Sequence, residues 1–195
     1  MMFNPVTFNV YAAIADCWKA LGLFWLIGLA FTKPTVRRQS AGSRLLHYVL
    51  AITGGLLIWG YLFPRDWLGG RFVPHTPSVA LAGLALTIAG CLFAVWARIT
   101  LGANWSGRAT VKAGHELIVK GPYALARHPI YTGVLLGLAG TVLAIGQWRC
   151  VLGFFIIVLA FVVKISQEER LMTETFPQAY PDYRRRVKAL IPGIF

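Results

Sequence analysis

The sequence has few charged residues and very few acidic ones. Only 13% of its 195 residues are Asp, Glu, Lys or Arg, whereas an average soluble domain has about 25%. Just seven residues are acidic, while 57% are hydrophobic. This composition excludes a disordered chain and indicates a protein whose immediate surroundings are membrane lipids.

Cysteine is also scarce. Cys17, Cys91 and Cys150 lie far apart inside apolar runs, with no Cys-x-x-Cys pair and no His/Cys pair at the spacing of a metal site. We interpret them as packing residues, and we predict neither a disulfide framework nor a bound metal.

Long apolar stretches are present in place of charge, and a helix needs ~20 such residues to cross the hydrocarbon core. Five are found, at residues 11–31, 45–63, 78–97, 130–147 and 150–163. Only residues 147–149 separate the last two stretches, which predicts a tight helical hairpin. The fifth helix can continue toward Glu168 if that part of the helix packs against protein and not against lipid. Spanning segments must satisfy their own backbone groups, so we predict an all-α integral membrane protein with five transmembrane helices.

The positive charges indicate an orientation. Fifteen of the nineteen lysines and arginines fall in segments on one side of the five crossings. The positive-inside rule then places the N-terminus outside and the C-terminus in the cytosol. The net charge of +12 is explained by this topology, so we expect contact with anionic lipids and no nucleic-acid partner. The N-terminus lacks the features of a cleaved signal peptide, so we expect the first span to be retained.

We divide the chain into two parts, three N-terminal spans (residues 1–97) and a functional core (residues 98–195). The core has a polar stretch before the hairpin and a polar tail after it. Gly114 and Gly121-Pro122 mark turns in the polar stretch, and residues 117–119 between them look extended. The N–H and C=O groups of an extended segment suit an adenine edge or an amino-acid group.

The start of the fourth span favours an anion. Pro129 is a residue that the first turn of a helix tolerates, and that turn offers N–H donors and a positive dipole end. Arg127 adds a planar, charged donor fork. Two alternatives stay open. Arg127 could be an arginine that reaches the membrane interface and has no further role, and His115 and His128 could be ordinary interfacial histidines.

Two adjacent carboxylates, Glu168 and Glu169, directly follow the fifth span. Ionisable groups near the membrane are candidate functional residues, although a solvated helix end is the alternative. Neighbouring residues on a helix point about 100° apart, so one glutamate can face a site while the other faces solvent or an arginine. Lys164 precedes Glu168 by four residues, in the less favourable order for a structural ion pair. Farther on, the helical spacing of Phe176, Tyr180 and Tyr183 is typical of packing.

Four motifs occur in order in the second half of the chain. They are Gly-His-x-Leu-x-x-x-Gly-x-Tyr (114–123), Arg-His-Pro-x-Tyr-x-Gly (127–133), Glu-Glu (168–169) and Phe-x-x-x-Tyr-x-x-Tyr (176–183), with a closing Ile-Pro (191–192). In these motifs the sequence resembles the isoprenylcysteine carboxyl methyltransferases and the related phospholipid methyltransferases. The resemblance covers about residues 101–195.

The resemblance implies an S-adenosylmethionine-dependent membrane methyltransferase. Its cofactor would lie in a cytosolic pocket closed by the C-terminal tail, and a lipophilic small molecule would enter from the bilayer. The cofactor-binding residues implied are His115, Glu116, Leu117, Ile118, Gly121, Tyr123, His128, Pro129, Ile130, Tyr131 and Glu168, with Glu168 accepting from the cofactor's ammonium. The catalytic residues implied are Arg127, Lys164 and Glu169. Lys164 stands where the prenylcysteine enzymes have an arginine that contacts the substrate carboxylate.

The first expectation for the reaction is carboxyl O-methylation of a prenylcysteine-like acceptor. A carboxylate is already ionised at neutral pH, so this reaction needs no base. The alternative is N-methylation of a phospholipid amine, which would need Glu169 or His128 as a base. Two other hypotheses are an NADPH-dependent enzyme like the membrane sterol reductases and a non-enzymatic membrane subunit. No sequence feature indicates an oligomeric state.

Overall fold

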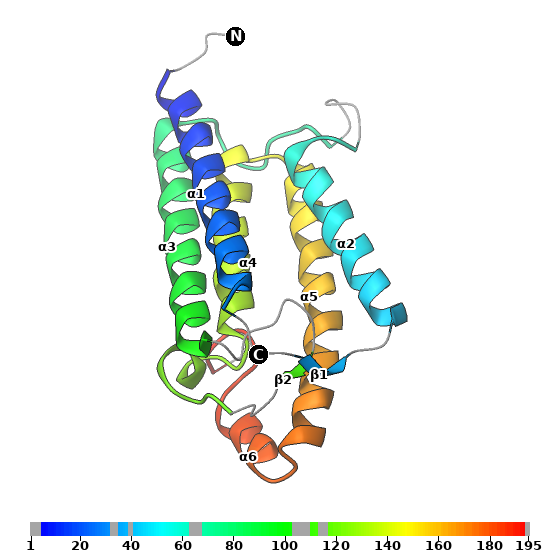
Figure 1. Cartoon of the computed structure of the whole chain (residues 1–195). Coiled ribbons are helices and arrows are strands. Elements are labelled where there is room, and N and C mark those ends of the chain that lie inside the picture. The colour runs from blue at the N-terminus through cyan, green and yellow to red at the C-terminus, as the bar shows by residue number, and fades with distance from the viewer. Residues whose placement is uncertain are drawn as a thin grey trace.

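The structure is a bundle of five long helices with its polar elements gathered at one end (Figure 1). The computed structural model describes residues 5–31, 35–38, 41–62, 68–102, 110–112 and 117–193. The long helices are α1 (Pro5–Leu29), α2 (Ala41–Trp59), α3 (Pro77–Leu101), α4 (Pro129–Ile145) and α5 (Trp148–Thr175). The short elements are β1 (Thr35–Arg38), β2 (Thr110–Lys112), the 3-10 helix η2 (Gly121–Ala124) and α6 (Ala179–Arg186).

The expected helical architecture holds for the bundle, with one addition. β1 and β2 pair in an antiparallel ribbon in which Arg37 lies opposite Val111. The sequence did not predict this ribbon, because two strands of a few residues carry too little periodicity to recognise. Their pairing depends on the tertiary fold that brings them together.

The helices differ in how well they match a membrane. Three are long and apolar enough to cross one, namely Asn9–Leu29 within α1, α3 and α5. The apolar parts of α2 (Leu45–Trp59) and α4 are shorter. The second span was expected to reach Phe63, but α2 ends at Trp59. Gly60 follows with φ +81°, and the N–H of Tyr61 bonds back to the C=O of Leu56, a left-handed turn that closes the helix.

Glycines on facing helices let the backbones approach closely. A Cβ on Gly90 of α3 would lie 2.2 Å from the backbone nitrogen of Gly137 in α4, and one on Gly54 of α2 would lie 2.6 Å from the C=O of Gly153 in α5. Small residues are the usual means of close helix packing in lipid. The bundle therefore consists of α1 and α4 packed against α3, and α2 packed along α5.

The predicted hairpin between the last two long helices is confirmed. α4 ends at Ile145 and is capped by Gly146, whose φ of +70° is left-handed, and α5 begins at Trp148. Arg149, near the start of α5, donates hydrogen bonds of 2.6 and 2.7 Å to the C=O groups of Leu57 and Ile58. This contact satisfies carbonyls at the C-terminal end of α2 and fixes α2 to α5. The three cysteines are free, as predicted.

Candidate functional site

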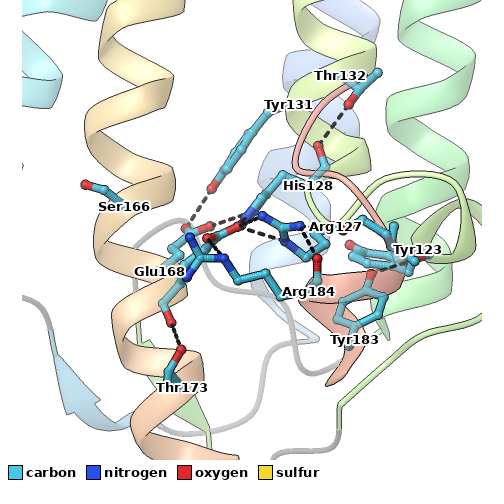
Figure 2. Close-up of polar contacts among 12 residues, drawn as sticks. Tyr123, Arg127, His128, Tyr131, Thr132, Ser166, Glu168, Thr173, Tyr183 and Arg184 are labelled. Carbon is cyan, nitrogen blue, oxygen red and sulfur yellow. Dashed lines mark hydrogen bonds and ion pairs between the residues drawn. The ribbon is translucent and has the colours of Figure 1, made fainter. Parts of the chain in front are cut away.

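The polar site lies where α4 begins and α5 emerges from the bundle, beside α6 and the segment after it (Figure 2). His128 caps the N-terminus of α4, and Pro129 occupies the first helical position. One helical turn on, the ring of Tyr131 stacks with that of His128 at 5.7 Å between centroids and with Phe161 of α5 at 4.8 Å. Three aromatic rings therefore connect α4 to α5 at the site.

Glu168 of α5 points into this stack. The hydroxyl of Tyr131 donates a 2.6 Å hydrogen bond to one carboxylate oxygen, and Nδ1 of His128 lies 3.5 Å from the other. The side chain of Glu168 is only 18% exposed. Lys164 lies one turn earlier on α5, with its ammonium 5.1 Å from the centroid of the Tyr131 ring. Glu168, His128, Tyr131 and Lys164 thus form one cluster.

Glu169 points elsewhere and is bound by arginines. Two guanidinium nitrogens of Arg127 donate to its Oε1, the Nε at 2.8 Å, and Nε of Arg184 lies 3.4 Å from its Oε2. Nε2 of His128 is 3.4 Å from Oε1. The side chains of Arg127 and Glu169 are 7% and 10% exposed, so this is a buried ion pair. The sequence-based expectation that the two glutamates face different surroundings is confirmed.

The tail after α6 is fixed to the start of α4 by backbone and side-chain bonds. The N–H groups of Arg127 and His128 donate to the C=O groups of Lys188 and Ala189 at 2.8 and 2.9 Å. The guanidinium of Arg127 also donates to the C=O groups of Arg184 and Val187. Arg127 therefore joins α5, α6 and the tail.

Two tyrosines of α6 are buried, and one of them attaches α6 to η2. Tyr180 and Tyr183 are 2% and 3% exposed, and the hydroxyl of Tyr183 donates to the C=O of Tyr123 in η2 at 2.5 Å. Burial raises the pKa of Tyr183 to about 12, so it remains a neutral donor. The predicted packing role of the tail tyrosines is confirmed.

His128 lies between the two carboxylates. Burial alone lowers the pKa of His128, but its contacts with Glu168 and Glu169 outweigh burial and raise the pKa above the ordinary 6.5. Each ring nitrogen then donates toward one glutamate, which is the arrangement of an imidazolium. The site thus holds a histidine between two carboxylates, and Arg127 pairs with the second of them.

This arrangement predicts a pH dependence of stability. A pKa raised by folding contributes stability that is fully present below pH 6.5 and is lost as the pH rises through the folded value. We expect the thermal midpoint of the detergent-solubilised protein to fall over this window, at a fixed scan rate. A His128→Gln variant should lose that slope, whereas His75→Gln, whose ring contacts Tyr11 of α1 just before α3 begins, should keep it. An equal slope in His128→Gln and the unmodified protein would contradict the assignment.

The structure brings most of the sequence-predicted residues together. His128, Tyr131, Lys164 and Glu168 form the cluster described above, and Arg127 and Glu169 form the ion pair beside it. Pro129 and Ile130 are the first residues of α4. Gly121, with φ +59°, and the buried Tyr123 belong to η2, and Leu117 and Ile118 are partly exposed just before it. His115 and Glu116 lie outside the described residues.

Three residues at the site were not identified from the sequence. Arg184 was only one of several basic tail residues, and Phe161 was one apolar residue of a span. His47 of α2 was overlooked, although a histidine inside an apolar stretch is a recognisable signal. Its Nδ1 lies 2.9 Å from the C=O of Ala160, and its ring lies 6.2 Å from that of Phe161.

Comparisons with known proteins find a family match and several relatives. Residues 83–174 match the Isoprenylcysteine carboxyl methyltransferase (ICMT) family. A probable protein-S-isoprenylcysteine O-methyltransferase of Oryza sativa subsp. indica is 29% identical over 94% of this chain and 99% of its own length. The cobalt-zinc-cadmium resistance protein CzcN of Cupriavidus metallidurans is 30% identical over 66% of this chain and 54% of its own length.

A solved structure has the same fold. The eukaryotic intramembrane Ras methyltransferase ICMT aligns with a TM-score of 0.57 and 22% identity over 80% of this chain. The present chain spans 55% of the length of that one. The helical arrangement is therefore shared with a membrane protein of known structure.

Proposed function

We propose that this chain, whose residues 83–174 match the isoprenylcysteine carboxyl methyltransferase family, is an integral-membrane enzyme that methylates the carboxylate of a prenylcysteine-like acceptor with S-adenosylmethionine. The observation that carries the proposal is the cluster of Glu168, His128 and Tyr131, which lies within the matched residues 83–174. It combines a buried anion with aromatic rings at the edge of the bundle.

The donor set of the cluster fits S-adenosylmethionine. The molecule carries an ammonium, a sulfonium, a carboxylate and an adenine, and when bound it supplies an electrophilic methyl group. Glu168 is a buried carboxylate with acceptor sites beyond the two that Tyr131 and His128 use, so it would hold the ammonium. The ring of Tyr131, stacked with His128 and Phe161, holds its hydroxyl on Glu168 and so fixes the carboxylate for this contact. Backbone groups of Leu117 and Ile118 would complete the site.

The charges of the site favour a carboxylate acceptor over an amine. N-methylation requires a base, yet Glu169 is paired with two guanidiniums and both ring nitrogens of His128 face carboxylates. A carboxylate needs no base, because it is ionised at neutral pH. Its reaction joins an anion with a cation, which a site shielded from water favours. The main task of the chain is then to align the two reactants. Such alignment lowers the activation barrier by up to ~7–11 kcal/mol in favourable cases.

Lys164 is the residue that we propose for contact with the acceptor. Its ammonium lies against the Tyr131 ring, one turn from Glu168 on the same helix. An acceptor carboxylate bound to the Lys164 ammonium would lie beside the residues proposed to hold the methyl donor. Arg127 and Glu169 are positioning residues in this proposal. Their buried ion pair orients His128 and holds the tail.

We propose that all five long helices cross the membrane, with the C-terminus in the cytosol. The asymmetry of basic residues supports this orientation. α5 has 28 residues and a length of about 42 Å, so one end extends beyond a hydrocarbon core of ~30 Å. Since Glu168 lies near that end, the site would be at the cytosolic interface. The tail bonds to Arg127, His128 and Thr132 support closure of the pocket by the tail.

A methyl-transfer assay tests the proposed function. Membranes containing the protein are incubated with radiolabelled S-adenosylmethionine and either a prenylcysteine or phosphatidylethanolamine. We expect label in a base-labile ester of the prenylcysteine. Label in the phospholipid amine alone would overturn carboxyl methylation. Thermal stabilisation by NADPH and not by S-adenosylmethionine would overturn the methyltransferase assignment.

A further inference from the structure

A second hollow lies on another face of α5. It is an open cleft of about 540 Å³ between the lower part of α5, α6 and the tail. The basic residues Arg170, Arg184 and Lys188 line it, as do the apolar Val162 and Ile165. Ser166 also lines the cleft. The cleft therefore has a cationic part and an apolar part.

The cationic part has more positive than negative charge. Its one acidic lining residue is Glu169, which already pairs with Arg127 at the floor of the cleft. Arg184 and Arg170 have side chains 61% and 80% exposed, and each pairs with a carboxylate at 3.4 Å. Lys188 adds a further cation. This surplus is complementary to a group with negative charge, such as a phosphate.

The apolar part continues along α5 into the membrane-facing surface. Phe155, Leu159 and Val162 follow one another at helical spacing, with exposures of 63%, 51% and 38%. Residues four and three apart lie on one face of a helix, so these side chains form a stripe that ends in the cleft. An amphipathic molecule could lie with its chain on the stripe and its charged head among the basic residues.

The cleft adjoins the proposed methyl-transfer site and shares the Arg127–Glu169 pair with the site residues described above. Glu168, Tyr131 and Lys164 are not among its lining residues. On α5, Glu168 accepts a hydrogen bond from Tyr131 of α4, whereas Ser166 and Arg170 line the cleft. The buried Arg127–Glu169 pair lies between the two.

We propose that this cleft binds the phosphate head of an anionic glycerophospholipid. Its acyl chain would lie along Phe155, Leu159 and Val162, and its phosphate would lie among Arg170, Arg184 and Lys188. The apolar stripe favours a lipid over free phosphate, because free phosphate would leave that surface unused. Binding there would hold the tail against α5, since Lys188 and Arg184 belong to the tail and α6.

A thermal-stability titration in detergent tests the lipid site. Dihexanoyl phosphatidylglycerol, dihexanoyl phosphatidylcholine and glycerol phosphate are added to the full-length protein without any methyl donor, and stabilisation is followed against concentration. We expect the anionic lipid to stabilise at concentrations where the other two do not. Each basic residue near an anionic lipid contributes about five-fold in affinity, so Arg170→Gln with Lys188→Gln should weaken it about twenty-five-fold.

The matched control removes the same charge outside the cleft. Arg185→Gln with Arg186→Gln changes two residues of α6 that do not line it, so the response should remain near that of the unmodified protein. Equal loss in both double variants, or full stabilisation by glycerol phosphate, would overturn the lipid site. Because no methyl transfer is measured, failure here is distinguishable from failure of the proposed enzyme activity.

Discussion

A Glu168→Gln variant should bind S-adenosylmethionine about 10- to 100-fold more weakly, and its methyl transfer at low cofactor concentration should fall by a similar factor. A hydrogen bond to a charged group contributes about 1.5–3 kcal/mol, which corresponds to this range. The carboxylate is buried, and its removal leaves a cofactor ammonium without an anionic partner. Calorimetry of the purified protein measures the change directly.

The glutamine substitution is chosen because it preserves the fold. Its amide oxygen can still accept from Tyr131, and His128 retains Glu169 as a partner. Glu174→Gln serves as the control, since that carboxylate lies two turns on in α5, is 40% exposed and contacts Arg170. We expect unchanged affinity for the control. Equal affinity of Glu168→Gln and the unmodified protein would show that the ammonium does not bind at Glu168.

Replacement of Arg127 by methionine should have the largest effect on stability. Removal of one partner from a buried ion pair costs about 3–5 kcal/mol, because the other charge remains buried. Here the loss also leaves the C=O groups of Arg184 and Val187 without their guanidinium donor. We expect a lower thermal midpoint in detergent and faster amide exchange at residues 187–190, where the tail contacts α4.

Two further variants separate the role of Arg127 from a general loss of charge. Arg127→Lys keeps the charge but loses the two-pronged contact, so its midpoint should lie between those of the methionine variant and the unmodified protein. Arg185→Gln removes a cation whose ion pair with Asp182 is 76% and 58% exposed, and exposed pairs contribute little. A midpoint drop as large in Arg185→Gln as in Arg127→Met would refute the role of the buried pair.

The roles of the two adjacent glutamates could be predicted only in part. Their helical offset of about 100° required different surroundings for each, and a nearby apolar span made both candidates for function. The helical offset alone could not predict which of the two glutamates would form an ion pair with an arginine. The structure assigns Arg127 and Arg184 to Glu169 and leaves Glu168 with Tyr131 and His128.

The aromatic and tail contacts lay beyond prediction from the sequence. Phe161 is one apolar residue among many in its span, and its stacking on Tyr131 depends on how α5 turns relative to α4. The end of α2 was expected four residues too late, because Gly60 was not recognised as its left-handed stop. The ribbon of β1 and β2 joins segments about 70 residues apart, which no local pattern encodes.

By itself, the sequence determined the helical architecture, the hairpin of the last two helices and the resemblance to one methyltransferase family. These follow from local properties, namely the length of apolar runs, turn residues and motifs of fixed spacing. Only the tertiary structure decided which charges meet. The environment of His128 arises from Glu168 and Glu169, about 40 residues away, and the position of the tail arises from its bonds to Arg127. Such contacts depend on distances in space, and the strength of a buried charge pair is set by neighbours that the sequence does not place side by side.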